Sequence, residues 1–192
     1  MPEDRKFIWD NYTGNKPRTI EHNFVDYDRY FEANLIRATL KREIDIDFKS
    51  LRVVDFGCCA GDYGIYFARL GSPTQFIDID PDAMSFVEYR LGLEGLINTK
   101  ELFIFDLAIF GEVLEHCDDP LGILNQYVKN KTKAIFTSSY PYRSDDPNDH
   151  YWNKSGHSKK ALESQKDCRK LLEDNYKAFH LGGERRLWIY KN

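Results

Sequence analysis

Residues 51–66 read LRVVDFGCCAGDYGIY, and this stretch guides the interpretation of the rest of the chain. Strand-forming residues end at Asp55, a turn with three glycines follows, and residues 63–70 have the character of a helix. Glycine lets a backbone turn sharply and approach a ligand, and the N-terminus of a helix offers unpaired N–H groups. A strand, a glycine turn and a helix in this order are typical of a nucleotide-binding α/β domain. An ordinary tight turn without a ligand is the alternative.

The composition indicates a globular protein of one domain. The chain has 192 residues, 42% of them apolar, which is enough to build a sizeable core. A net charge of −4 gives no broad basic field, so the balance argues against nucleic acid as a partner. Four cysteines without a C-x-x-C pair favour a reducing compartment. The charged N-terminus lacks the apolar core of a signal peptide, and no run is long enough for a membrane helix. We therefore expect a cytoplasmic protein without a membrane partner.

The N-terminal part divides into an arm and the start of the domain. Residues 1–22 are polar with scattered aromatics and predict a loop or arm, while residues 23–192 form a single domain. Between residues 23 and 46, apolar residues recur at spacings of three and four, which predicts an amphipathic helix packed on the sheet. The predicted apolar stripe contains Phe24, Tyr27, Tyr30, Phe31, Leu35, Ile36 and Leu40.

A second strand-to-helix unit follows at residues 74–93. The strand ends in acidic residues, and Asp80 with Pro81 predicts a capped helix start. Asp78 lies about as far beyond the glycine turn as the acid that binds a ribose in nucleotide-binding folds. A carboxylate there can accept both ribose hydroxyls, although a plain strand-end residue is the alternative.

The remaining chain predicts further units of the same kind. Residues 102–110 and 133–138 predict buried strands, and helices are expected to start at Asp119–Pro120 and at Ser158. Two runs about Gly182–Gly183 predict a C-terminal hairpin.

Together these motifs resemble the class I S-adenosylmethionine (SAM)-dependent methyltransferases. The resemblance rests on VVDFGCCAG at 53–61, FIDIDP at 76–81, FDLAIFGEVLEH at 105–116 and AIFTSSYP at 134–141. It implies a Rossmann-like α/β fold: a mostly parallel sheet with an antiparallel C-terminal hairpin strand and helices on both faces. SAM is the implied cofactor. The glycine turn alone would also suit a dinucleotide-dependent oxidoreductase, and EVLEH is the more selective motif.

The resemblance also implies which residues meet the cofactor. The turn would line its methionine part, Asp78 would hold the ribose, and the segment from Glu112 would lie beside the transferred methyl group. The full implied set is Asp55, Gly57, Cys58, Cys59, Gly61, Asp78, Ile79, Glu112 and Val113.

The sequence departs from the family pattern in two places. Cys59 stands where the family usually has a second glycine. The interval between Asp78 and Asp106 is too short for a helix, a full strand and an adenine-contacting loop, so we expect a shortened third-strand region. Residues 97–101 are the only candidates for an adenine contact.

The segment Glu112-x-x-Glu115-His116 offers two routes to activate a hydroxyl. A histidine can act as a general base, with His116 or His157 as candidates, or a divalent cation can lower the pKa of the hydroxyl. The pattern is similar to that of metal-assisted O-methyltransferases. It would give Mg²⁺ or Mn²⁺ the ligands Glu112, Glu115, His116 and His157, with His150 as the alternative to His157. The alternative interpretation is that EVLEH packs against the cofactor and binds no metal.

Residues 139–157 read SYPYRSDDPNDHYWNKSGH and predict a substrate loop. Loops that follow strands at the carboxyl edge line the sites of such folds. Aromatic faces between carboxylates and amides suit a polyhydroxylated ligand, because a sugar ring packs on the aromatic and its hydroxyls bond to the polar groups. A solvated loop anchored by aromatics is the alternative. The candidate substrate residues are Tyr140, Tyr142, Arg143, His150 and Trp152.

The sequence thus predicts an O-methyltransferase whose acceptor is the hydroxyl of a sugar or glycan. A small phenolic metabolite is the nearest alternative acceptor. A catalytically silent SAM-binding module remains the alternative from another class, because of Cys59 and the short third-strand region.

Overall fold

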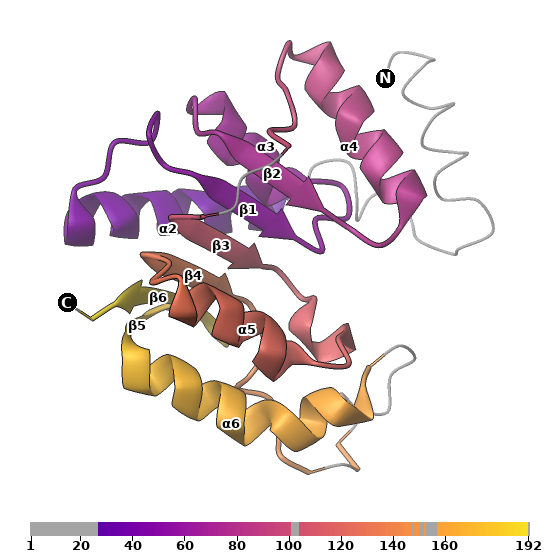
Figure 1. Ribbon diagram of the computed structural model, residues 1–192, viewed down its shortest axis with the longest axis vertical. Coiled ribbons are helices and arrows are strands. Elements are labelled where there is room, and N and C mark those ends of the chain that lie inside the picture. Colours follow the sequence, from indigo (N-terminus) through magenta and orange to yellow (C-terminus); the bar gives the residue numbers. More distant parts are fainter. Residues whose placement is uncertain (1–26, 101–103, 147, 150–151, 153–156, 192) are drawn as a thin grey trace.

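A computed structural model of the chain describes residues 27–100, 104–146, 148–149, 152 and 157–191. The predicted arm at 1–22 and the first residues of the predicted N-terminal helix lie outside this part. A six-stranded sheet in the order β2-β1-β3-β4-β6-β5 forms the centre (Figure 1). Within the described residues, no helix is long and apolar enough to cross a bilayer.

The sheet is parallel except at one side. Strands β2, β1, β3 and β4 run parallel, β6 pairs antiparallel with β4, and β5 closes the hairpin. This confirms the predicted mostly parallel sheet with an antiparallel hairpin. The strands are β1 (Val53–Phe56), β2 (Thr74–Ile77), β3 (Leu107–Phe110), β4 (Ala134–Thr137), β5 (Tyr176–Gly182) and β6 (Arg185–Tyr190).

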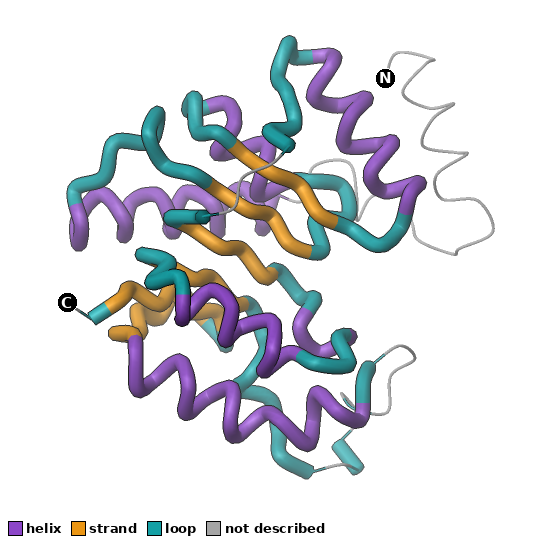
Figure 2. Tube along the Cα trace, viewed as in Figure 1, coloured by secondary structure: helices purple, strands orange, loops and turns teal. Residues whose placement is uncertain are grey.

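Helices cover both faces of the sheet, as predicted. One apolar cluster joins α2 and α3 to the sheet, and a second joins α5 and α6 to the opposite face, where Val54, Ala108 and Ile135 point. Helix α4 packs on β2 and α3. The helices are α2 (Tyr27–Ile44), α3 (Asp62–Arg69), α4 (Pro81–Leu93), α5 (Pro120–Lys129) and α6 (Lys159–Asn175), with a short 3₁₀ turn, η2 (Leu114–His116) (Figure 2).

Three helix starts follow the predicted capping chemistry. The side chains of Asp80, Asp119 and Ser158 accept hydrogen bonds from backbone N–H groups of the first turns of α4, α5 and α6. These caps fix the points where the chain turns away from the carboxyl edge of the sheet, and the site is built from the same turns.

The predicted apolar stripe of the first helix needs a correction. Phe31 is 64% exposed, whereas its neighbour Glu32 is 4% exposed. Glu32 is buried because the Tyr63 hydroxyl and the Arg185 guanidinium both bind its carboxylate. The spacing predicts that Phe31 packs on the sheet, but Glu32 is buried in its place because two residues distant in sequence bind its carboxylate.

The third-strand region is shortened, as predicted. The described residues between α4 and β3 contain no strand. Two hydrogen bonds stand in its place on the outer edge of β2: the Phe76 N–H donates to Asn98 Oδ1, and the Thr99 N–H donates to the Thr74 carbonyl.

The next strand starts later than predicted. It begins at Leu107, because the carboxylate of Asp106 turns to bind Arg52 and Lys133 at the amino-terminal end of the sheet.

Candidate cofactor and acceptor site

The glycine turn has an unusual backbone at three positions. Gly57, Cys59 and Gly61 all have positive φ, at 68°, 49° and 77°. A side chain at position 57 is impossible without movement, because an added Cβ would lie 2.2 Å from Cγ2 of Val113. Cys59 adopts a left-handed conformation that glycine reaches more readily than other residues, so this turn has the backbone of a glycine-type turn at all three positions.

Side chains behind the turn hold it in place. Asp55 is 2% exposed, and its Oδ2 accepts the Gly64 N–H at 2.8 Å. Burial raises the pKa of the Asp55 carboxyl to about 7. This carboxylate therefore acts from beneath the turn, a correction to the expectation that it faces the cofactor.

An ion pair fixes the other side of the turn. Arg90 of α4 binds Asp62 through Nη1 at 2.7 Å, and the same nitrogen donates to the Ala60 carbonyl. Asp62 is 2% exposed, so the guanidinium offsets the cost of burying this carboxylate. The pair joins α4 to the start of α3.

Cys58 is part of the turn itself. Its thiol contacts Met84 in the core, its N–H donates to the Ile77 carbonyl, and its carbonyl accepts from Gly61. These contacts shape the turn, and the contact of Cys58 with the cofactor stays a prediction.

Asp78 and Ile79, which are predicted to meet the adenosine part of the cofactor, lie directly after β2. The two carboxylate oxygens of Asp78 accept the N–H groups of Cys59 and Asp80, which orients the group at the carboxyl end of β2. Each oxygen keeps a lone pair for a further donor such as a ribose hydroxyl. Ile79 is fully exposed, at 101%, and offers an apolar surface beside that carboxylate.

The segment from Glu112 connects the glycine turn to the end of β4. Val113 packs directly on Gly57. Glu112 has a φ of 56°, and its N–H donates to the Ser138 hydroxyl at 2.7 Å. Its side chain is exposed. The segment that is predicted to lie beside the transferred methyl group therefore contacts the glycine turn directly.

The structure brings His116 and His157 together. Their ring centroids are 4.8 Å apart, and the edge of Trp152 approaches His157 with centroids 6.0 Å apart. His116 belongs to η2, whereas His157 ends the loop before α6, where the Ser158 N–H donates to the Glu115 carbonyl. That backbone bond sets the two imidazoles side by side.

The predicted metal ligands do not converge within the described residues. Glu112 and His116 are exposed, whereas Glu115 is 3% exposed. The part of the chain that the structure describes contains no group of three or more His, Cys, Asp or Glu side chains arranged to hold a metal ion. His150, the alternative ligand, lies outside that part, so the metal stays a prediction and we derive no step from it.

The predicted substrate loop divides into core and surface residues. Tyr140 is 1% exposed, and its hydroxyl contacts Ala161, Ser164 and Cys168 of α6. This is a correction: Tyr140 anchors the loop on the helix and cannot contact a substrate.

Tyr142 and Arg143 also bind protein groups. The Tyr142 ring stacks on Trp188, and its hydroxyl donates to Glu173 at 2.7 Å. Arg143 lies 2.8 Å from Glu184 of the hairpin. The structure therefore gives both residues a place in holding the loop to α6 and β6, and they are not gathered about the two histidines.

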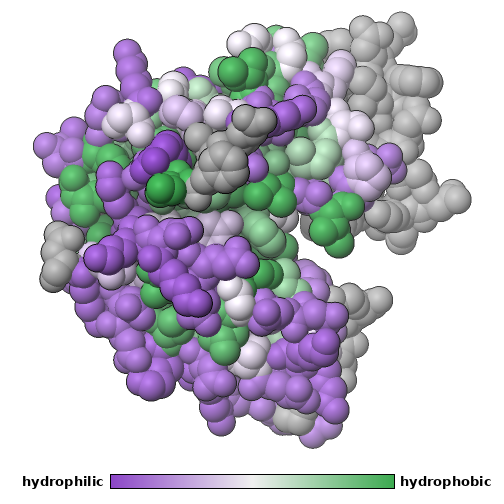
Figure 3. Space-filling model, in the orientation of Figure 1, coloured by the Kyte–Doolittle hydropathy of each residue, from purple (hydrophilic) through white to green (hydrophobic). Residues whose placement is uncertain are grey.

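Trp152 is the loop aromatic that lies beside His157. Its Nε1 donates to the Ser144 carbonyl at 2.6 Å. Figure 3 shows the molecular surface hollowed on its right side, between the part that carries α4 and the part that carries α5 and α6. The strand arrows of Figure 1 point to that side, so the hollow lies at the carboxyl edge of the sheet.

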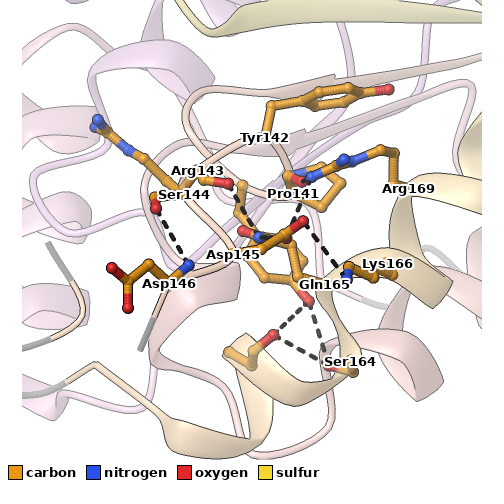
Figure 4. Close-up of polar contacts among 12 residues, drawn as sticks. Pro141, Tyr142, Arg143, Ser144, Asp145, Asp146, Ser164, Gln165, Lys166 and Arg169 are labelled. Carbon is orange, nitrogen blue, oxygen red and sulfur yellow. Dashed lines mark hydrogen bonds and ion pairs between the residues drawn. The ribbon is translucent and has the colours of Figure 1, made fainter. Parts of the chain in front are cut away.

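Two polar groups near the site were not predicted from sequence. Gln165 is wholly buried in α6, and its Nε2 donates to the Arg143 carbonyl and to Asp145 (Figure 4). Glu32 is held by Tyr63 and Arg185, as described above. A charged or amide residue within an amphipathic helix is ordinarily placed outside, so no local signal identifies either.

The comparisons with known proteins agree with this geometry. Residues 27–175 match a family model described as a methyltransferase domain. The chain belongs to this family. No curated protein matches the chain in sequence. The resemblance to class I SAM-dependent methyltransferases is therefore confirmed.

Several solved structures share the fold at low identity. One is magnesium protoporphyrin IX methyltransferase from Synechocystis PCC 6803 with bound S-adenosylhomocysteine (SAH). It is 14% identical to this chain and has a TM-score of 0.58, and the match covers 95% of this chain and 92% of that chain. A second structure of the same methyltransferase holds SAM, and SAM as the predicted cofactor agrees with both.

Another similar structure is monomeric WbdD, a bifunctional kinase-methyltransferase. It is 17% identical with a TM-score of 0.58, and 95% of this chain matches 44% of that chain. A Klebsiella pneumoniae protein provisionally assigned as an O-methyltransferase is 12% identical with a TM-score of 0.61, and 98% of this chain matches 90% of that one. At these identities the structures show a shared fold.

The residues present fit a SAM cofactor. The backbone of the turn has positive φ at Gly57, Cys59 and Gly61, and Asp78 retains acceptor capacity. Ile79 supplies an exposed apolar surface next to it. The residues predicted to hold the cofactor stay Gly57, Cys58, Cys59, Gly61, Asp78, Ile79, Glu112 and Val113.

Proposed function

We propose that this methyltransferase acts on oxygen and transfers the methyl group to a hydroxyl of a sugar or glycan. The observation that carries the proposal is the contact between His116 and His157, whose ring centroids are 4.8 Å apart. His116 lies three residues after Val113, which packs on the glycine turn. The proposal therefore puts the proton acceptor on the segment that contacts this turn.

The roles of the residues follow from methyl-transfer chemistry. When bound, SAM supplies an electrophilic methyl group. A hydroxyl is a weak nucleophile until its proton is removed, and a positioned imidazole can accept that proton near neutral pH. We assign this step to one histidine of the pair, while the other orients it. The turn, Asp78 and Ile79 position the cofactor, and alignment of the two reactants supplies much of the rate.

The choice of a sugar acceptor rests on the surroundings of His157. Trp152 presents an aromatic ring next to that imidazole, and sugar rings pack on such faces. A small phenolic metabolite would use the same base and ring, and is the alternative acceptor. We further propose a cytoplasmic location, because the four cysteines form no disulfide.

The test combines binding and turnover. Calorimetry should give SAM binding, and methyl-labelled SAM should label a neutral glycan. His116→Gln and His157→Gln should each lower kcat by about 10² or more, because one proton-transfer group is lost. The dissociation constant of SAM should stay within threefold.

His180→Gln is the matched control, because His180 is an exposed residue of β5 in the hairpin. Its turnover should equal that of the wild type. SAM binding without transfer to any hydroxyl would refute the enzyme and favour a silent module. A thermal shift with NAD(H) but none with S-adenosylhomocysteine would favour an oxidoreductase instead.

A further inference from the structure

A cavity of about 520 Å³ lies between the loop after β4 and the first half of α6. Its volume is within the range of small-molecule sites. Eight residues line it: Asp145, Trp152, His157, Ser158, Lys159, Leu162, Glu163 and Lys166. Five of them belong to the start of α6 or to its cap, where no sequence motif predicts a site.

This cavity shares two residues with the proposed acceptor site. His157 lines the cavity, and its ring also contacts His116. Trp152 lines the cavity as well and approaches the same imidazole. The cavity lining therefore includes one histidine of the pair and the aromatic ring beside it.

The charges of the lining balance. Asp145 and Glu163 supply two carboxylates, and Lys159 and Lys166 supply two ammonium groups. The pairs are long, at 3.8 Å for Lys166 with Asp145 and 3.9 Å for Lys159 with Glu163, and all four side chains are at least 43% exposed. Such exposed pairs are weak, and Asp145 in addition accepts from Gln165 and lies 3.6 Å from Arg169. The four charged side chains offer hydrogen-bond donors and acceptors without an excess of positive or negative charge. A phosphate would favour an excess of positive charge, and a cationic ligand would favour an excess of negative charge.

Hydrogen bonds to residues outside the lining fix two of the side chains that form the cavity. The Trp152 indole is fixed by its bond to the Ser144 carbonyl, and Asp145 accepts from the buried Gln165 at 2.8 Å (Figure 4). Trp152 on one side of the cavity and Asp145 on the other are therefore already ordered before a ligand binds. This lowers the conformational entropy that is lost on binding.

Resting on the proposed function, we infer that the acceptor is a neutral oligosaccharide whose second unit occupies this cavity. The unit that receives the methyl group lies against His116 and His157. The neighbouring unit packs on Trp152, and its hydroxyls bond to the charged residues of α6. The cavity thereby selects chains of two or more sugar units over single sugars.

The test measures sugar binding without SAM. Saturation-transfer NMR is recorded with neutral trisaccharides of gluco, manno and galacto configuration, with the corresponding monosaccharides, and with sulfated trisaccharides. At least one neutral trisaccharide should bind at least tenfold more tightly than its monosaccharide. Trp152→Ala should weaken that binding at least tenfold, and Lys166→Met about threefold.

Lys170→Met is the matched control, since Lys170 lies one turn further along α6 and does not line the cavity. It should bind like the wild type. In turnover, Trp152→Ala should raise the KM of the trisaccharide more than it lowers kcat.

Three outcomes would overturn the inference: no trisaccharide binds, sulfated forms bind more tightly than neutral ones, or Trp152→Ala binds like the wild type. If a phenolic acceptor is methylated while no sugar binds, the inference fails and methyl transfer to oxygen stands. If trisaccharides bind but no methyl group is transferred, the cavity assignment is supported and the proposed function fails.

Discussion

Backbone atoms shape the cofactor side of the carboxyl edge (residues 55–64 and 78–82), whereas side chains shape the acceptor side (residues 139–158 and α6). On the cofactor side, three positive φ angles and the N–H groups of Cys59 and Gly64 form the turn. On the acceptor side, Tyr140 and Gln165 fasten an irregular loop to a helix. The cofactor side therefore accepts few substitutions, because its backbone angles favour glycine. The acceptor side depends on side-chain contacts, so loops of different sequence could be fastened to the same helix.

The largest effect is expected at Gly57. Gly57→Ala places a Cβ 2.2 Å from Val113 Cγ2 at a φ of 68°, so overpacking and backbone strain add up to about 4 kcal/mol of lost stability. Denaturant unfolding measures the loss, and calorimetry should show no SAM binding.

Two further variants check that interpretation. Gly92→Ala, where an added Cβ meets nothing within 4 Å, should not lower stability. Gly57→Ala with Val113→Ala should recover part of the loss. If Gly57→Ala binds SAM normally, the turn is not the rigid element of the comparison.

Arg90 should come next. Arg90→Met leaves the buried Asp62 carboxylate without its guanidinium partner, which should cost about 3 kcal/mol. Arg69→Met, which removes a more exposed pair with Glu94, should cost less than about 1 kcal/mol. Equal losses in urea unfolding would show that the Arg90 pair contributes no more than a surface pair.

On the cofactor side, the Asp55 carboxyl makes the free energy of unfolding depend on pH. Its pKa is about 7 in the folded chain and near 4 when unfolded, so the folded state binds more protons between these values. Its contribution to stability is therefore complete below pH 4 and is lost as the pH rises through 7, by about 2 kcal/mol between pH 5 and pH 7. Asp55→Asn should flatten this part of the profile, and an unchanged slope in urea unfolding would contradict the raised pKa.

Gln165 tests the acceptor side. Gln165→Ala removes two hydrogen bonds that hold the loop, which should cost about 2 kcal/mol and raise the KM of the acceptor. SAM affinity should not change, because the cofactor side has its own supports. Gln126→Ala on the exposed face of α5 should alter neither quantity. Weaker SAM binding in Gln165→Ala would show that the two sides are coupled.

The smallest effect is expected at Cys59. Cys59→Gly relieves a φ of 49° but makes the unfolded chain more flexible, so stability should change by less than about 1 kcal/mol. SAM affinity should stay within threefold in calorimetry. A tenfold change would show that the Cys59 side chain contacts the cofactor.

The comparison also explains which features could be predicted from sequence. The glycine turn, the capped start of α4 and the hairpin follow from local backbone requirements, which leave glycine, proline and aspartate at fixed spacings. The shortened third-strand region follows from chain length alone.

The contacts of the acceptor side leave no such local signal. The sequence predicts Tyr140 as a substrate residue, yet its hydroxyl finds partners in α6, more than twenty residues away. Outside the acceptor side, Glu32 of α2 is likewise buried because Arg185 of the last strand binds it. Contacts of this length depend on how the elements pack and leave no pattern in the neighbouring sequence.

The hydrogen bonds at the outer edge of β2 also bear on how another chain could pair with that edge. An uncovered strand at the border of a sheet is a template on which another chain can add a strand and build fibres. Here the Asn98 side-chain amide and the Thr99 N–H occupy two of the backbone groups that such a chain would need. The β2 border is therefore a poorer template for a further strand than a fully unpaired edge.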